Sequence, residues 1–274
     1  MRIYNNVNAI TTQNQLNQTN AQMSKSLEKL STGLRINRAA DDAAGLSLSE
    51  GLRAQIRGSE QARRNSDDAT AMLQIAESGA QEITDSLQRM RELAIEASNG
   101  TYSNTERAYI QLEYSQLSCE ITRIANAVTY NGIPLLTTES SFTFQVSALG
   151  TGMASTISFS TVRLDDSSSG LDLAGSAVSS QSLAQAAITS IDSAITSVLS
   201  LRATIGAVMN RLEKTINSLG VMVSNLSDAE SRIRDLDFAT ETTRFTRNQI
   251  LTQSGTSMLS QANQLPQGVL SLLK

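Results

Sequence analysis

Hydrophobic residues along the chain form three stripes in which apolar positions recur at steps of three and four. The stripes cover 72–97, 110–128 and 183–226. Such steps place side chains on one face of an α-helix, so each stripe predicts a long amphipathic helix. None of these helices can bury its stripe alone. Together they predict an elongated antiparallel bundle, or coiled coil, with crossing angles of about 20°.

Asparagine and glycine mark the ends of the predicted helices. Asn99-Gly100 separates the first two stripes, and Asn131-Gly132 ends the second. Asn104 is the predicted N-cap of the middle helix, because its side chain can accept a hydrogen bond from the first turn.

The segment 133–180 has a different pattern. Residues 142–146 and 157–162 alternate between polar and β-branched or aromatic side chains, and Gly150-Thr151-Gly152 lies between them. This alternation predicts a β-hairpin at about 138–165, the one strand-like region of the sequence. The expected fold class is therefore mainly α, with one small β-hairpin.

The two ends of the chain carry apolar positions at helical spacing but no charge. No charged residue lies between Arg2 and Lys25 or between Arg247 and Lys274, where the polar positions are Asn, Gln, Ser and Thr. A helix on the surface of a monomer normally has charged residues on its wet face. Frayed tails are the alternative, but such tails usually have more charge and fewer large aliphatic residues. We expect the ends to be disordered in the monomer and to fold against neighbouring copies.

Composition argues against several classes of function. The net charge of −4 argues against nucleic-acid binding. The chain has no histidine, which excludes catalysis by a histidine and zinc sites with histidine ligands. The acidic pairs at 41–42, 67–68 and 165–166 are explained by helix starts and turns, and Cys119 by a packed or neutral surface thiol. We predict no catalytic, cofactor-binding or metal-binding residue.

Targeting signals of the general kind are also missing. The sequence contains no run of 18 apolar residues, so it predicts no membrane-spanning helix. The first residues lack the apolar core and the cleavage site of a secretory signal peptide. Export by a dedicated apparatus stays open.

Five segments resemble bacterial flagellins. They are MRIYNNVNAI (1–10), LSTGLRINRAADDAAGLSLSE (30–50), LQRMRELAIEASNGTYS (87–103), SRIRDLDFATE (231–241) and QILTQSGTSMLSQANQLPQGVLSLLK (249–274). The resemblance covers about 1–135 and 180–274, and such long ordered motifs are highly specific. It implies a structural subunit, not an enzyme, that assembles with itself into the helical flagellar filament used for swimming.

The resemblance also implies a domain arrangement. In the family, both termini pair as a coiled coil that lines a central channel, and the middle helices form an outer domain. We therefore expect a filament-core domain at 1–40 and 230–274, an outer bundle domain at 41–229 and no further variable domain. The residues predicted to form the filament core are Ile3, Val7, Ile10, Leu16, Met23, Leu27, Ile250, Leu251, Leu259, Leu265, Val269 and Leu270.

Export and partners follow from the same resemblance. The family is exported unfolded through the flagellar type III apparatus, which predicts a secreted protein in a filament outside the cell or in the periplasm. An export chaperone is expected at 235–274, and filament cap and hook-junction proteins are further expected partners. No membrane insertion is expected.

Two surface properties of the family map to single residues. Some flagellins are bound by a Toll-like receptor through an Arg, a Leu and a Glu, which match Arg89, Leu93 and Glu113 here. One turn beyond Glu113 the family often has another Arg, whereas this chain has Leu117, which counts against recognition. Flagellins are often O-glycosylated near the hairpin, and the candidates are Ser155, Ser167, Ser168 and Ser169.

Two other structural roles remain as alternatives. A hook–filament junction protein has similar termini, but its middle region usually lacks the block at 87–103. A signalling coiled coil would also have Ser- and Ala-rich heptads, but the hairpin and the uncharged ends argue against it.

Overall fold

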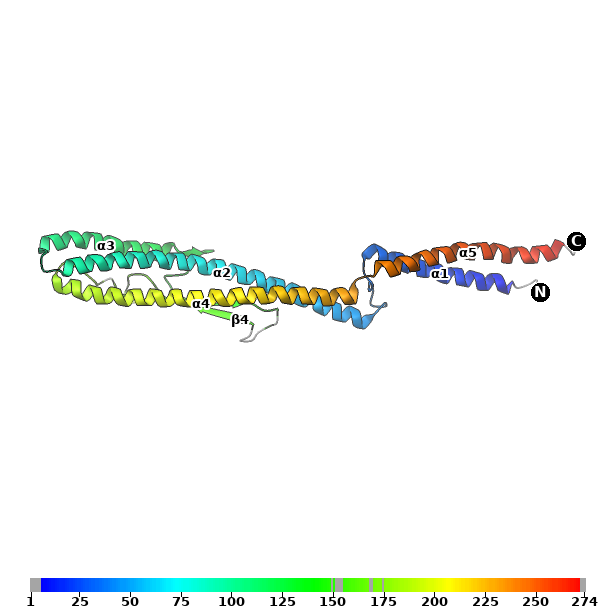
Figure 1. Ribbon diagram of the computed structural model, residues 1–274, viewed down its shortest axis with the longest axis horizontal. Coiled ribbons are helices and arrows are strands. Elements are labelled where there is room, and N and C mark those ends of the chain that lie inside the picture. The colour runs from blue at the N-terminus through cyan, green and yellow to red at the C-terminus, as the bar shows by residue number, and fades with distance from the viewer. Residues whose placement is uncertain (1–5, 149, 151–154, 168–169, 174, 272–274) are drawn as a thin grey trace. The chain divides into compact units, whose positions relative to one another are not determined.

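The computed structural model describes residues 6–148, 150, 155–167, 170–173 and 175–271, with side chains in the last segment up to 264. Its contacts divide the chain into two units. Unit 1 comprises 1–54 and 225–274, and unit 2 comprises 55–224. The elements are α1 (Val7–Thr32), α2 (Ala43–Ser98), α3 (Asn104–Ala127), β1 (Thr129–Tyr130), β2 (Ile133–Pro134), β3 (Ser141–Gln145), β4 (Thr156–Ser160), α4 (Gln181–Arg234) and α5 (Phe238–Ser271) (Figure 1).

The core of unit 2 is formed by the stripes of α2, α3 and α4. The stripe of α2 is buried throughout, at Met72, Ala76, Ala80, Ile83, Leu87, Met90, Ala94 and Ala97. The α4 stripe is buried at Ala184, Ala187, Ile191, Ala194, Val198, Leu201, Ile205, Val208 and Leu212. At its first turn Ala184 is buried and Leu183 is exposed, so the stripe begins one residue later than predicted. The mainly α bundle is confirmed.

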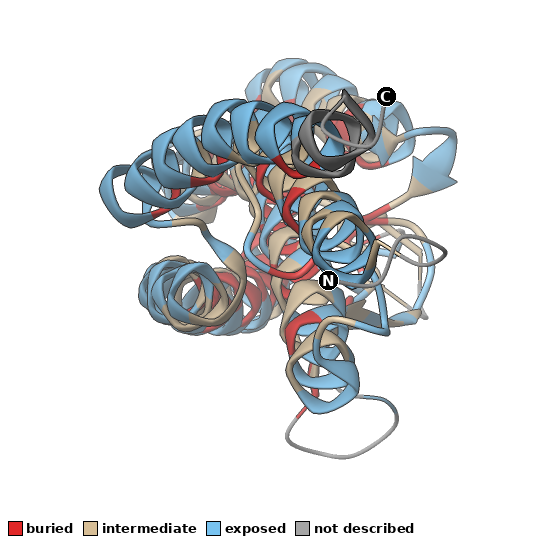
Figure 2. Cartoon of the chain, turned by 90° about the vertical axis from the view of Figure 1, so that its right-hand side faces the viewer, coloured by how far each residue is buried: buried red, intermediate tan, exposed pale blue. Residues whose placement is uncertain are grey.

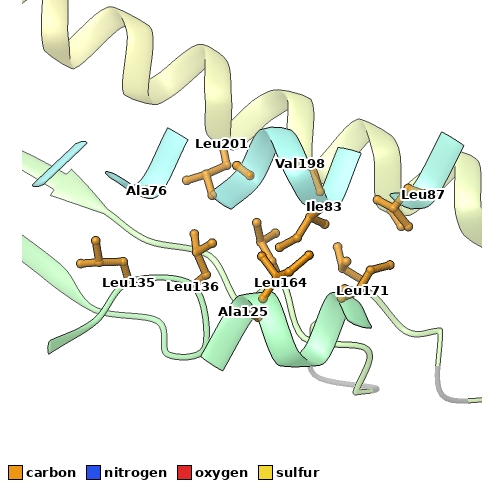
Figure 3. Close-up of a cluster of buried hydrophobic side chains, with 14 of the residues drawn as sticks. Ala76, Ile83, Leu87, Ala125, Leu135, Leu136, Leu164, Leu171, Val198 and Leu201 are labelled. Atoms are coloured by element: carbon orange, nitrogen blue, oxygen red, sulfur yellow. The ribbon is translucent and has the colours of Figure 1, made fainter. Parts of the chain in front are cut away.

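Leucines from the connecting segments complete this core. Leu135, Leu136, Leu164, Leu171 and Leu173 are all buried. Figure 3 shows four of them among side chains of α2, α3 and α4. The segment 133–180 is therefore not only a surface hairpin, because its loops close one side of the helical core.

The turn between α2 and α3 is fixed by polar groups. Ser103, not Asn104, is the N-cap of α3, so the predicted cap was wrong by one residue. Ser103 and Glu106 form a capping box in which each side chain accepts a hydrogen bond from the other's backbone N–H, at 3.3 and 2.6 Å. The buried Arg107 guanidinium donates to the carbonyl oxygens of Ala97 and Asn99 at the end of α2, and the Asn99 carbonyl also accepts from the Tyr102 N–H.

The predicted hairpin is confirmed. Strands β3 and β4 are antiparallel, with Thr143 opposite Ser158, and the alternation buries Ile157 and Phe159 while their neighbours face solvent. The prediction of only one strand-like region was wrong. Strands β1 and β2 form a second two-stranded ladder around Asn131-Gly132, whose φ angles of 50° and 76° make a tight turn that asparagine and glycine tolerate.

Within the described residues, α4 is the helix long and apolar enough to cross a membrane by length and composition. Its apolar stripe packs in the core of unit 2, and a soluble core helix passes the same test. This feature is therefore explained by the bundle.

Candidate assembly surface of the terminal helices

The two terminal helices pair with each other in unit 1. α1 and α5 lie side by side and antiparallel (Figure 1). Asn6 begins α1 by accepting a hydrogen bond from the N–H of Ala9, and its amide donates to the carbonyl oxygen of Ala262 at 2.8 Å. Further along, the Thr252 hydroxyl donates to the Asn20 side chain at 3.3 Å. The contacts that join the helices are thus partly polar.

The buried residues of the pair are small or polar, and they recur every seven positions. In α1 they are Thr19 and Ser26, and in α5 they are Glu241, Asn248 and Ala262. Gly255 continues the α5 series, and a side chain added there would lie 3.3 Å from Leu16 Cδ1. A stable two-stranded coiled coil normally buries large aliphatic residues at such positions. The pair therefore gains little apolar burial from its own seam.

Several large aliphatic residues of these helices face outward instead. Ile250 and Leu251 are 57% and 49% exposed, and Val7, Ile10 and Leu27 are exposed to a similar degree. Most of the surface of the helices nearest the two termini is exposed or intermediate in Figure 2. Leu16, Met23 and Leu259 are half-buried.

The exposed aliphatic side chains of α5 line a shallow groove. It has a volume of about 520 Å³, and its lining residues are Thr242, Thr243, Thr246, Arg247, Ile250 and Leu251. We call it the apolar groove. Exposed aliphatic surface of this kind is typical of a site that another molecule covers.

Four of the predicted core residues cannot be placed in this way. Ile3 lies outside the described residues, as do the side chains of Leu265, Val269 and Leu270. Their role stays a prediction from the sequence.

A short junction ties the inner ends of the terminal helices to the rest of unit 1. α1 ends at Gly33, whose φ of 71° is a left-handed conformation that glycine adopts without strain. Leu34 and Asp235 form an antiparallel bridge, and Leu236 N–H donates to the carbonyl oxygen of Gly33. The Arg35 guanidinium donates to the carbonyl oxygen of Ile233 at 2.6 Å. The motifs at 30–50 and 231–241 thus contact each other directly.

Ion pairs reinforce this junction. Arg234 lies 2.6 Å from Glu50, and Lys25 lies 2.7 Å from Asp41. The hydrogen bond from Lys25, together with the backbone N–H of Arg38, lowers the pKa of the Asp41 carboxyl to about 2. Asp41 therefore stays ionised throughout the neutral and mildly acidic range.

The residues predicted as receptor contacts have unequal exposure. Arg89 and Glu113 are half-exposed and form an ion pair at 2.8 Å between α2 and α3. Leu93 is only 2% exposed, because its side chain belongs to the core of unit 2. A protein bound at this surface would touch the ion pair but not Leu93.

The remaining candidates lie in unit 2. Ser155 is buried, and Ser167 is half-buried with its hydroxyl donating to Asp165. Ser168 and Ser169 lie outside the described residues. Cys119 is exposed on α3. Among the described residues, no three histidine, cysteine or acidic side chains are placed to share a metal ion.

Comparison with known proteins identifies the family. The model of the bacterial flagellin N-terminal helical region matches residues 3–141, and that of the C-terminal helical region matches 188–273. This chain belongs to the bacterial flagellins. It is 44% identical over 294 residues to the flagellar filament 33 kDa core protein of Treponema phagedenis and 42% identical over 312 residues to the flagellin of Bacillus subtilis, and each match covers all of both chains.

As a flagellin, the protein is a subunit of the flagellar filament, and neither alternative role is favoured. A solved structure of a hook-associated protein from Vibrio parahaemolyticus has a TM-score of 0.58, and the match covers 71% of this chain and all of that one. Its identity is 14%, so this likeness shows the fold alone. The two full-length relatives described above are, by contrast, a flagellar filament core protein and a flagellin.

Sequence reasoning missed the seam and the junction. The seven-residue recurrence of Glu241, Asn248, Gly255 and Ala262 was present in the sequence, but it is invisible to a search for apolar stripes. The junction depends on backbone hydrogen bonds between segments nearly 200 residues apart, for which no local pattern exists.

Proposed function

We propose that α1 and α5 form the inter-subunit core of the filament through their outward aliphatic residues. The observation that carries this proposal is the distribution of burial in the helix pair. Polar residues are buried in the seam between α1 and α5, whereas the aliphatic side chains of Ile250 and Leu251 are exposed on the outside. Burying one such side chain contributes about 1.5–3 kcal/mol. A neighbouring copy that covers the apolar groove therefore supplies the burial that the seam of a single chain lacks.

Assembly of this kind does not require a two-fold symmetric contact between two subunits. One surface of a copy contacts a different surface of the next, and such contacts continue without closing into a helical polymer. The uncharged polar positions of α1 and α5 suit helices surrounded by other helices, since no charge has to be buried.

We infer that the chain reaches the filament by export through the flagellar type III apparatus. We also infer that residues 235–274 bind an export chaperone before the chain is exported. The exposed apolar residues of α5 support this inference, because they need cover before assembly. Cap and hook-junction proteins are the expected partners at the two ends of the filament. Receptor recognition and glycosylation stay predictions.

Removal of 248–274 tests the proposed core. Purified full-length chain and chain 1–247 are each mixed with short filament fragments and viewed by electron microscopy. We expect only the full-length chain to elongate the fragments, because the deletion removes the second half of the helix pair and one side of the apolar groove. Elongation by both chains at equal rates would contradict the proposal.

A further inference from the structure

A basic cleft lies between α1 and α5, beside the apolar groove. Its volume is about 460 Å³. The charged side chains that line it are Lys25, Lys29, Arg244, Arg247 and Glu241, and the amide side chains are Gln22 and Asn248. All of them belong to unit 1.

The charges of this cleft do not balance within the chain. It holds four of the 22 cationic side chains but only one of the 26 acidic ones. Lys25 is paired with Asp41, and Arg244 lies 3.4 Å from the buried Glu241. Lys29 and Arg247 have no acidic partner within 4.0 Å among the described residues. The cleft is therefore a positive site in a chain whose net charge is −4.

The position of the cleft along the helix pair is informative. Lys25 and Arg247 are the charged residues that border the uncharged stretches of α1 and α5, which extend from them toward the two termini. The cleft and the apolar groove share Arg247 and Leu251, so they form one continuous surface. A molecule that covers the groove is thus placed to contact the cleft as well.

We propose that the basic cleft receives an acidic segment of a second copy of this chain, in the same contact that covers the apolar groove. The inference rests on the proposed filament core. Outside the cleft the chain has more acidic than basic side chains, so another copy can supply the negative charge that the cleft lacks. The exposed aliphatic residues of that copy can cover the apolar groove beside the cleft. A small inorganic anion would balance the charge but leave Ile250 and Leu251 exposed. Ion pairs at such a site fix the register of the subunits and speed their encounter.

Zero-length cross-linking of the native chain tests the contact directly. A carbodiimide activates a carboxylate, and attack by the lysine amine forms an amide while the activating group leaves as a urea. Filaments are grown from equal parts of unlabelled and ¹⁵N-labelled chain and digested for mass spectrometry. We expect Lys25 or Lys29 joined to an Asp or Glu of a differently labelled chain in filaments and not in monomers. Lys214, which lies in unit 2, is the control lysine. The proposal would be overturned if Lys214 formed links between chains while Lys25 and Lys29 formed links only within one chain.

Charge reversal tests what the contact contributes. In Lys29→Glu with Arg247→Glu, the cleft becomes acidic and repels the incoming segment. We expect the critical concentration for seeded growth to rise about tenfold or more at low salt, and the rise to shrink at high salt, because a modest ionic contact is worth about one factor of ten and is screened. Arg232→Glu is the matched control, since Arg232 is exposed in unit 1 outside the cleft.

The outcomes separate this inference from the proposed core. Lys29→Arg with Arg247→Lys keeps the charge and should assemble like the unmodified chain. If the reversed variant grows like Arg232→Glu while loss of the apolar residues still blocks growth, the ionic contact is wrong and the filament core stands. If neither change affects growth, both are wrong. The circular dichroism of each variant shows whether its helices are intact.

Discussion

Replacing Ile250 and Leu251 together with glutamate is expected to leave a folded, soluble monomer that does not elongate filament fragments. Both side chains are about half-exposed, so the monomer tolerates the charges. In the filament core the substitution removes two aliphatic contacts, each worth about 1.5–3 kcal/mol, and places two carboxylates against a neighbouring helix. The critical concentration for growth should rise at least about 100-fold.

Leu183→Glu is the control for this substitution. Leu183 is exposed to a similar degree, at 45%, but it lies in unit 2. Seeded growth measured by light scattering and electron microscopy should be near normal for the control and absent for the double variant. Filaments of normal length from Ile250→Glu with Leu251→Glu would remove the apolar groove from the account.

Leu136→Ala is expected to destabilise unit 2 by about 2–5 kcal/mol, as large-to-small substitutions in well-packed cores do. Leu136 is 0% exposed and lies in the connecting segment between β2 and β3, where it faces the helical core (Figure 3). Its loss leaves a cavity among side chains from three helices. Chemical denaturation followed by circular dichroism measures the change.

Ile133→Ala is the matched comparison for the core substitution. Ile133 lies three residues earlier, in β2, and is 44% exposed, so its truncation should cost well below about 1 kcal/mol. Equal effects of the two substitutions would mean that the segment 133–136 does not close the core as described.

The helices of unit 2 were predictable because their stripes are long and uninterrupted. Each position of the predicted stripe from Met72 to Ala97 is buried, and burial of one helix face enforces the three-and-four step of that stripe. The packing of Leu135, Leu136 and Leu164 was not predictable, since these residues lie in short irregular segments without a period. The second ladder was missed because Asn131-Gly132 ends a helix and makes a hairpin turn equally well.

The candidate site was predictable in part for a different reason. The absence of charge in both termini indicated burial against partners, and the outward position of Val7, Ile10, Ile250 and Leu251 agrees with that interpretation. Which side of each helix faces the partner was not predictable from the spacing alone. The seam residues Thr19, Ser26 and Asn248 are polar, so they resemble a solvent face in the sequence although they are buried.

Hydrogen exchange of the backbone amides in monomer and filament tests the central claim most directly. The weak polar seam predicts rapid exchange of 7–24 and 248–271 in the monomer, because helices with little apolar burial open readily. In filaments the same amides should be strongly protected, while the core of unit 2 around Leu87 and Ile121 is protected in both states. Terminal segments that exchange equally fast in monomer and filament would contradict the account.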